Sequence, residues 1–374
     1  MIRIGKFTDF YSDVTKMGTK ISQERYLSKG QFPIIDQGRQ TIAGRWDDED
    51  GIFSDVPAIV FGDHTRAIKY IEEPFFIGAD GVKILRPKNT QDSPKYLFYA
   101  LQAARIPDLG YSRHFKAVKE LDIRVCSKEE QAEIVRILES IDFLIEKRHE
   151  EVRYLDQAVK SRFIELFGMP GADDFGWGLT PLGSICYINP KKGQDHRLGS
   201  GVEVSFVPMP AVTEHGKIDA TAIKEYDEVK TGFTYFAEND VLFAKITPCM
   251  ENGKGAVARG LHNGLGFGST EFHVLRPISG RSNPYWIYTL TAFSQFREDA
   301  ASNMTGSAGQ RRVPASFLEN YRVAVPPIEL QQQFAAFVEQ TDKSKYYSSL
   351  SFRYCQTAAN TYRQEWMTCR TSDF

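Results

Sequence analysis

The clearest hydrophobic pattern in the chain is a spacing of four and three residues that begins at Ile134. Apolar residues recur at Leu138 and Ile141 and continue in this rhythm to Leu166. A heptad spacing of this kind predicts a long helix with one apolar seam, here over 127–168. At 1.5 Å per residue, a helix of roughly 38 residues is about 57 Å long.

A second helix with the same register is expected 200 residues later, over 327–374. Its middle is more polar, because Thr341, Lys345 and Ser348 fall on the seam. We expect the two helices to form an antiparallel coiled coil; the alternative is that each packs only on its own domain. The expected packing residues are Ile134, Leu138, Ile141, Leu155 and Val159 in the first helix and Phe334, Val338, Phe352 and Tyr362 in the second.

The rest of the chain is also duplicated. Leu85-Arg86-Pro87 recurs as Leu275-Arg276-Pro277, and Ser93-Pro94 corresponds to Asn283-Pro284 at the same shift of 190. Ser or Asn followed by Pro predicts the capped start of a helix. The shift becomes 200 at Glu329 and Gln331, so the second copy has an insertion, which we place at 303–310.

The first half of each copy is rich in glycine, proline and aromatic residues. The short runs 58–61, 202–206 and 241–243 are typical of strands. The predicted fold class is therefore α+β, with two mixed, sheet-rich domains separated by the two long helices. We expect domains at 1–126 and 169–326, helices at 127–168 and 327–374, and a breaker-rich linker at 168–176.

Composition excludes several classes of function. The five cysteines are scattered without a C-x-x-C pair, and no H-E-x-x-H or phosphate-binding G-x-x-x-x-G-K-[ST] motif occurs. No signal peptide or membrane-spanning stretch is expected, which favours a cytoplasmic protein. The net charge of −2 does not by itself indicate a nucleic-acid partner. We expect no catalytic residues, metal site or cofactor in this chain.

One segment carries a family resemblance. The run Thr305-Gly306-Ser307-Ala308-Gly309-Gln310-Arg311-Arg312-Val313 is followed by Phe317-Leu318 and by Val325-Pro326-Pro327-Ile328-Glu329-Leu330-Gln331 at a helix start. With the duplication and the long helices, it resembles the specificity subunits of type I restriction-modification enzymes. The first copy keeps Tyr111-Ser112-Arg113-His114 and Glu130-Gln131 but has Val125-Cys126-Ser127 in place of the prolines.

The resemblance implies a function without catalysis. Each domain would read one half of a split double-stranded DNA target, and the helices would fix the gap between the halves. Two DNA methyltransferase subunits would dock on the chain, and restriction subunits would join them. S-adenosylmethionine, ATP and Mg²⁺ would then be needed only in those partners.

Candidate DNA contacts are cations for phosphates, and forked or amide side chains for base edges, in loops. In the first domain they are Arg39, Arg45, His64, Arg66, Lys69, Tyr111, Ser112, Arg113, His114 and Lys116. In the second they are Lys191, Lys192, Lys245, Thr247, Asn252, Lys254, Ser307, Gln310, Arg311 and Arg312. The alternative for each is solvated surface without a ligand.

Two other functions fit the sequence less well. One is the specificity subunit of a type IIB-like system, in which the partner fuses methylation and cleavage. The other is a free-standing duplicated protein that binds a sugar or a peptide, which the absence of a convergent catalytic set disfavours.

Overall fold

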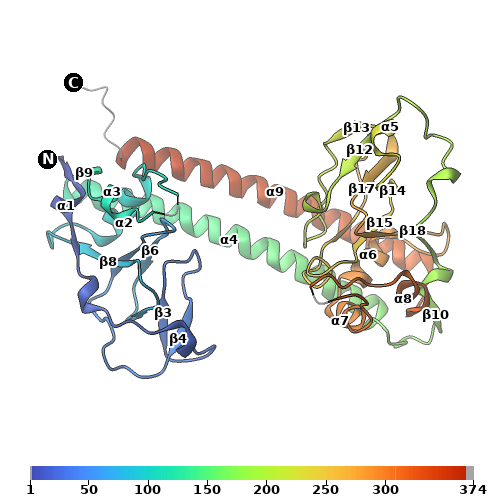
Figure 1. Ribbon diagram of the computed structural model, residues 1–374, viewed down its shortest axis with the longest axis horizontal. Helices are drawn as coiled ribbons and strands as arrows, with labels where there is room; N and C mark the ends of the chain where they lie inside the picture. Colours follow the sequence, from blue (N-terminus) through green and yellow to red (C-terminus); the bar gives the residue numbers. More distant parts are fainter. Residues whose placement is uncertain (1, 111, 308, 368–374) are drawn as a thin grey trace. The chain divides into compact units, whose positions relative to one another are not determined.

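The computed structural model describes residues 2–110, 112–307 and 309–367 and divides into two compact units (Figure 1). Unit 1 takes the chain up to Glu150 and again from Ser348, and unit 2 takes Glu151–Tyr347. The division therefore runs through both long helices. Each unit contains half of each helix.

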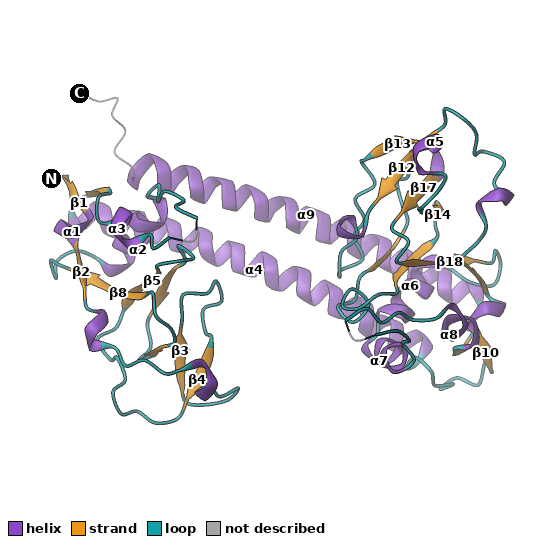
Figure 2. Cartoon of the chain, in the orientation of Figure 1, coloured by secondary structure: helices purple, strands orange, loops and turns teal. Residues whose placement is uncertain are grey.

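Unit 1 is built on two small sheets and a strand pair (Figure 2). The first sheet has the order β2 (Tyr11–Asp13), β8 (Val82–Pro87), β5 (Ala58–Gly62), β6 (Ile68–Ile71), and the second has β4 (Gly44–Trp46), β3 (Phe32–Ile35), β7 (Phe76–Ile77). Strands β1 (Arg3–Lys6) and β9 (Asp122–Val125) pair separately. The helices are α1 (Phe7–Phe10), α2 (Pro94–Ala103) and α3 (Phe115–Val118). Apolar residues of α2 and β5 form the core, in which Tyr96 and Leu97 are fully buried.

Unit 2 repeats this plan. Its first sheet has the strand order β11 (Cys186–Ile188), β18 (Phe272–Pro277), β15 (Val241–Ala244), β16 (Gly255–Val257). Its second sheet has the strand order β13 (Ile223–Glu225), β12 (Glu203–Val207), β17 (Leu265–Gly268), β14 (Thr234–Ala237). Strands β10 (Leu179–Pro181) and β19 (Arg322–Ala324) form the separate pair. The helices are α5 (Tyr226–Val229), α6 (Pro284–Ala292), α7 (Ser294–Ser302) and α8 (Ala315–Asn320). The α+β fold class and the internal repeat are thus confirmed.

The helix starts predicted from the repeat are also confirmed. The Ser93 side chain accepts a hydrogen bond from the backbone N–H of Tyr96, and Asn283 does the same for Tyr285. The insertion lies elsewhere than expected, because the extra residues of the second copy form α7 and not the loop 303–310. A nine-residue helix there accounts for most of the ten-residue change in shift.

The long helices are α4 (Lys128–Phe167) and α9 (Ile328–Met367). In unit 1, Ile134 and Leu138 pack in the core with Tyr362 beside them, and Phe352 contacts the His149 ring at 4.4 Å. In unit 2, Val159 shares a core with Phe334 and Val338, and Lys345 pairs with Asp156 at 2.7 Å. The antiparallel pairing is confirmed, and the alternative that each helix packs only on its own domain is wrong, although the helix ends also enter the domain cores. Ile141 and Leu155 are half-buried, and their individual packing stays a prediction.

No helix within the described ranges combines the length and the apolar character needed to span a bilayer.

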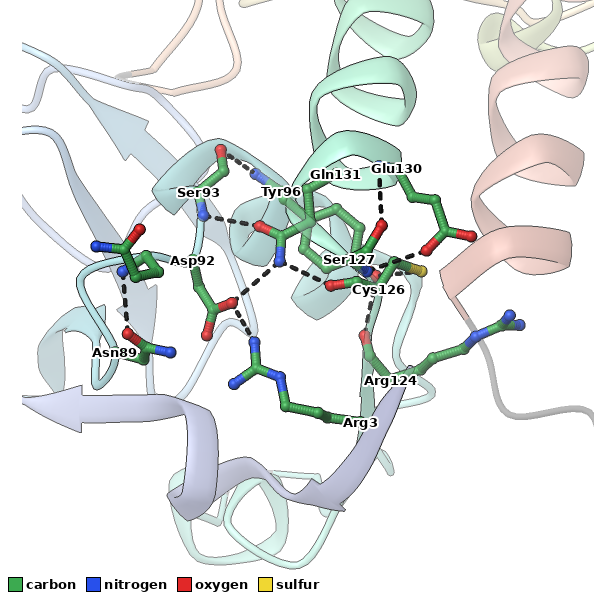
Figure 3. Close-up of polar contacts among 11 residues, drawn as sticks. Arg3, Asn89, Asp92, Ser93, Tyr96, Arg124, Cys126, Ser127, Glu130 and Gln131 are labelled. Atoms are coloured by element: carbon green, nitrogen blue, oxygen red, sulfur yellow. Dashed lines mark hydrogen bonds and ion pairs between the residues drawn. The ribbon is translucent and has the colours of Figure 1, made fainter. Parts of the chain in front are cut away.

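A buried glutamine joins each long helix to its domain, and Figure 3 shows the one in unit 1, Gln131. Gln131 accepts a hydrogen bond from the Ser93 N–H at 2.8 Å and donates to Asp92 and to the Cys126 carbonyl, both at 3.0 Å. Gln331 likewise accepts from Asn283 N–H at 2.8 Å and donates to the carbonyls of Arg281 and Pro326. One side chain thus satisfies a helix-cap N–H and a carbonyl next to the long helix. This explains why glutamine occupies the equivalent position in both copies.

Candidate nucleic-acid interface

In unit 1, four loops meet at one end of the sheets. We call them loop cluster 1: 36–41, 62–67, 78–81 and 108–114, of which residue 111 lies outside the described residues. The Asp63 N–H donates to the Gly81 carbonyl at 2.7 Å, and the His114 N–H donates to the Asp63 carbonyl at 2.9 Å. The Thr65 hydroxyl donates to the Gln37 carbonyl and so connects loop 36–41 to loop 62–67.

Two buried polar side chains hold loop cluster 1 together. The Asp63 carboxylate accepts a hydrogen bond from the Phe115 N–H at 2.6 Å. The His114 ring lies 2.8 Å from the Asp63 carbonyl through Nδ1, and its Nε2 accepts from the Leu109 N–H at 3.1 Å. These partners assign the neutral tautomer with the proton on Nδ1. The chain before α3 is therefore fixed to the turn between β5 and β6.

Several predicted DNA contacts lie at the surface of loop cluster 1. Arg39, His64, Ser112 and Arg113 are exposed, and Lys116 is exposed one residue into α3. Arg66 is half-buried and pairs with Asp108 at 2.7 Å. The structure brings these residues together from separate parts of the sequence; contact of any one with DNA stays a prediction. Tyr111 lies outside the described residues.

Two predicted contacts of the first domain are buried, and a third is hydrogen-bonded within the protein. His114 is 1% exposed, and Lys69 is 7% exposed with its ammonium group 2.8 Å from the Asp36 carbonyl. Burial also lowers the pKa of Lys69. Arg45 lies on β4 and donates to the Gly30 carbonyl at 3.2 Å. We correct the predictions for His114 and Lys69, because both side chains are buried and their polar groups have partners inside the protein. Arg45 is half-buried, and its contact with DNA stays a prediction.

In unit 2, the equivalent loops also meet. We call them loop cluster 2: 208–217, 245–254, 269–271 and 303–313, of which residue 308 is not described. The Lys245 N–H donates to the Glu271 carbonyl at 2.9 Å, and the Val313 N–H donates to the Lys245 carbonyl at 2.9 Å. These two bonds correspond to those of Asp63 in unit 1. The same junction is therefore built twice from different side chains.

Arginine–carboxylate pairs stabilise loop cluster 2. Arg312 binds Glu271 through two hydrogen bonds, Nε to Oε2 at 2.9 Å and Nη2 to Oε1 at 2.8 Å. The Arg312 hydrogen bond lowers the pKa of Glu271, so the pair is ionised at neutral pH. Arg311 lies 3.5 Å from Glu251. Both arginines thus order the loops, and their positive charge is partly neutralised within the protein.

The closing segment of loop cluster 2 is a hairpin. Thr305 and Arg312 exchange two backbone hydrogen bonds of 3.0 and 2.8 Å. Gly306 has φ +118°, and a Cβ there would lie 2.9 Å from the Gln310 carbonyl oxygen, so only glycine fits. The hairpin presents Ser307, Gln310 and Arg311 at the surface.

The other predictions for the second domain fall into two groups. Lys245, Thr247, Asn252 and Lys254 share the loop 245–254, with Asn252 exposed. Lys191 and Lys192 lie outside this loop, at the turn Lys192–Gln194, where the Lys192 ammonium group donates to the Lys230 carbonyl after α5. Contact of this lysine pair with DNA stays a prediction.

Sequence reasoning missed the loop 208–217, which follows β12 as 36–41 follows β3. The Thr213 carbonyl accepts from the Gly255 N–H at 3.4 Å, which attaches this loop to the start of β16, directly after loop 245–254. It exposes His215 and Lys217 around Gly216, whose φ is +77°. The run Glu-His-Gly-Lys was the available signal: a glycine turn with two potential cations.

A buried histidine supports loop cluster 2. His273 is 5% exposed; its Nε2–H donates to the Val313 carbonyl at 2.8 Å, and its Nδ1 accepts from the Asn189 amide at 3.0 Å. Burial lowers the pKa of His273 below its usual 6.5. The folded protein therefore favours the neutral ring.

The stability of unit 2 is expected to depend on pH through His273. Below about pH 6.5 the unfolded chain binds a proton that the folded chain does not, so stability falls with decreasing pH by at most about 1.4 kcal/mol per pH unit until the folded pKa is reached. Above pH 6.5 this contribution is fully present. Denaturant unfolding of the wild type and of His273→Gln at pH 7.5 and 5.5 measures it. Equal losses on acidification in both proteins would show that His273 is not responsible.

Comparisons with known proteins agree with this geometry. The family model described as "Type I restriction modification DNA specificity domain" matches residues 6–154 and 176–346. Over 155 residues the chain is 44% identical to the type I restriction enzyme EcoEI specificity subunit of Escherichia coli. This alignment covers 41% of this chain and 25% of that protein. The EcoAI specificity subunit of Escherichia coli is 42% identical over 163 residues, covering 42% of this chain and 26% of that protein. The alignments thus span about a quarter of the length of these relatives.

A solved structure shows the same fold. The S subunit of a type I restriction-modification system from M. genitalium superposes with a TM-score of 0.55 at 15% identity, over 99% of this chain and 97% of that one. The family model covers both copies of the repeat, each of which contains one loop cluster. This chain belongs to the family of type I restriction-modification DNA specificity domains.

Proposed function

We propose that this chain recognises a bipartite double-stranded DNA target, with each loop cluster reading one half. The observation that carries the proposal is the repetition of one loop junction in two units, each with exposed cations and polar side chains. Cations bind phosphates without regard to sequence, and amide or guanidinium groups distinguish base edges. The continuous helices α4 and α9 would set the gap between the halves.

The proposal places the chemistry in partner subunits. Methyltransferase subunits would bring S-adenosylmethionine, and restriction subunits would bring ATP and Mg²⁺. This assignment rests on membership of the specificity family. The chain would then determine the DNA sequence to which the complex binds.

A repeated surface on the long helices supports two copies of one partner. At the shift of 200, Arg153, Tyr154, Ala158 and Glu165 are identical to Arg353, Tyr354, Ala358 and Glu365. Tyr154 is 58% exposed and Tyr354 is 79% exposed. Buried apolar positions of the same helices differ instead: Ile134 and Leu138 correspond to Phe334 and Val338.

That distribution is the reverse of what folding alone requires. Exposed helix positions tolerate most substitutions within about 0.5 kcal/mol, so two diverged copies have no folding reason to retain the same surface. Tyrosine and arginine are the residue types that dominate protein interfaces. We therefore assign this repeated face to docking of the modification subunit, once on each helix.

Stoichiometry tests this docking face. Tyr354→Ala is expected to reduce the bound methyltransferase from two copies to one, and Tyr154→Ala with Tyr354→Ala to remove both, measured by native mass spectrometry of the co-expressed complex. Tyr347→Ala is the control, because Tyr347 is 68% exposed on the same helix but corresponds to Lys147 in the other copy. Two bound copies in the double variant would contradict the assignment.

DNA recognition itself is tested by binding. The assembled complex should bind one family of sequences selected from random duplexes more tightly than unselected DNA, with affinity that falls as salt rises. Equal affinity for selected and unselected duplexes would reject the proposal.

A further inference from the structure

Arg297 is a buried cation whose hydrogen bonds, among the described residues, go only to main-chain carbonyls. It lies on α7 and is 6% exposed. Its Nε donates to the Thr291 carbonyl at 2.8 Å, Nη1 to Met250 at 2.7 Å and Nη2 to Gly253 at 3.2 Å. The guanidinium group also lies 4.9 Å from the centre of the Phe243 ring. Two of the three acceptors belong to loop 245–254.

Burying this charge is unfavourable in itself. Burial lowers the pKa of Arg297 to about 10, so the side chain remains a cation at neutral pH. Carbonyl dipoles and an aromatic face replace the water that the guanidinium group loses. An apolar residue would fill the site without the free energy of desolvation that a buried charge requires. The arrangement therefore indicates that the two loop carbonyls need a hydrogen-bond donor at this place.

The loop it supports is compact and internally bonded. The Met250 N–H donates to the Ile246 carbonyl at 3.0 Å and the Asn252 N–H to the Pro248 carbonyl at 2.9 Å. The Met250 side chain is fully buried, whereas Asn252 is exposed. Gly253, with φ +89°, turns the chain back towards β16.

The first copy has neither the long loop nor its support. There β5 and β6 are joined by a tight turn, in which the Gly62 N–H donates to the Ala67 carbonyl at 2.8 Å. Among the described residues between α2 and α3 there is no helix like α7. The longer loop and the helix that braces it therefore occur together, only in unit 2 of the described chain.

We propose that Arg297 is a positioning residue that holds loop 245–254 in the shape in which Asn252 reads a base of the half-site recognised by unit 2. The proposal rests on the proposed DNA-binding function. An asparagine amide forms paired hydrogen bonds with an adenine edge only when its backbone is held at a fixed distance from the groove. Arg297 supplies that restraint from inside the protein and does not touch DNA.

The test uses the assembled complex and a pool of random duplexes. Asn252→Ala is expected to lower discrimination at one base position of one half-site by about tenfold or more. Arg297→Met should reduce discrimination at the same position to a similar degree and leave the other half-site unchanged. Arg297→Lys, which keeps the charge but has one donor group, should lie between the wild type and Arg297→Met.

Two further readouts separate positioning from general damage. The salt dependence of binding should stay at the wild-type value in Arg297→Met, because no phosphate contact is removed, while amide hydrogen exchange in 245–254 should become faster. Val323→Ala, in the buried strand β19 of the same unit, controls for lost stability and should keep the wild-type preference.

The outcomes distinguish the two proposals. If the wild-type complex has no sequence preference, the proposed function fails. If the wild type discriminates and Arg297→Met, still folded, keeps full discrimination in both halves, Arg297 has only a structural role. If Arg297→Met does not fold, Arg297→Lys decides: unchanged discrimination together with unchanged exchange in the loop would overturn the proposal.

Discussion

Replacing Arg39, Arg113 and Lys116 together by alanine is expected to weaken DNA binding about a hundredfold at physiological salt. All three are exposed in or next to loop cluster 1, which brings them together from distant parts of the sequence. A cation that neutralises one phosphate contributes about 0.9 to the slope of log affinity against log salt, so the slope should decrease by about 2.7. Titration of the assembled complex with a fluorescent duplex at several salt concentrations measures both quantities.

The control removes exposed cations from another part of unit 1. Lys6 lies on β1, and Lys88 follows β8 at the opposite end of that strand from Gly81 of loop cluster 1. Lys6→Ala with Lys88→Ala should leave the slope and the affinity within about twofold of the wild type. Equal losses in both variants would mean that binding depends on overall charge and not on loop cluster 1.

Phe334→Ala is expected to destabilise unit 2 by about 3–5 kcal/mol. Phe334 is fully buried where α9 enters the core, and its ring lies 5.6 Å from that of Phe163 and 5.4 Å from that of Phe167, both on α4. Alanine would leave a cavity between the two helices, and rigid neighbouring rings can fill it only in part. Guanidinium unfolding followed by circular dichroism measures the loss.

Tyr347→Ala on the same helix is the matched comparison, because its ring is exposed and its loss should change stability by less than about 0.5 kcal/mol. A cost below about 1 kcal/mol for Phe334→Ala would show that the end of α4 and the start of α9 do not share a core as described.

The sequence pattern predicted the architecture because its signals are local or repeated. The Ser93 and Asn283 caps, the buried strands of each copy and the helix starts near residues 128 and 328 depend on neighbouring residues. The duplication then showed which segments are equivalent. The predicted position of the insertion was wrong, because the residues of α7 have no counterpart in the first copy with which they could be aligned.

The candidate site was predicted less completely. Arg39 and Arg113 are more than 70 residues apart, and only the fold shows that both belong to loop cluster 1. The burial of His114 and Lys69 could not be anticipated, because a basic residue in a polar loop has the same sequence signature whether it faces solvent or a buried carbonyl. The pairing of Arg312 with Glu271 joins positions 41 residues apart, so its local sequence gave no sign of it.

Selecting binding sequences from random duplexes with three complexes shows whether each loop cluster reads its own half of one target. These contain the wild type, a loop cluster 1 variant that removes two exposed polar side chains able to contact base edges (His64→Ala with Ser112→Ala) and a loop cluster 2 variant (Asn252→Ala). We expect two specified blocks separated by unspecified bases for the wild type, with one block weakened in the first variant and the other block weakened in the second. A single block, or loss of both blocks in either variant, would contradict this expectation.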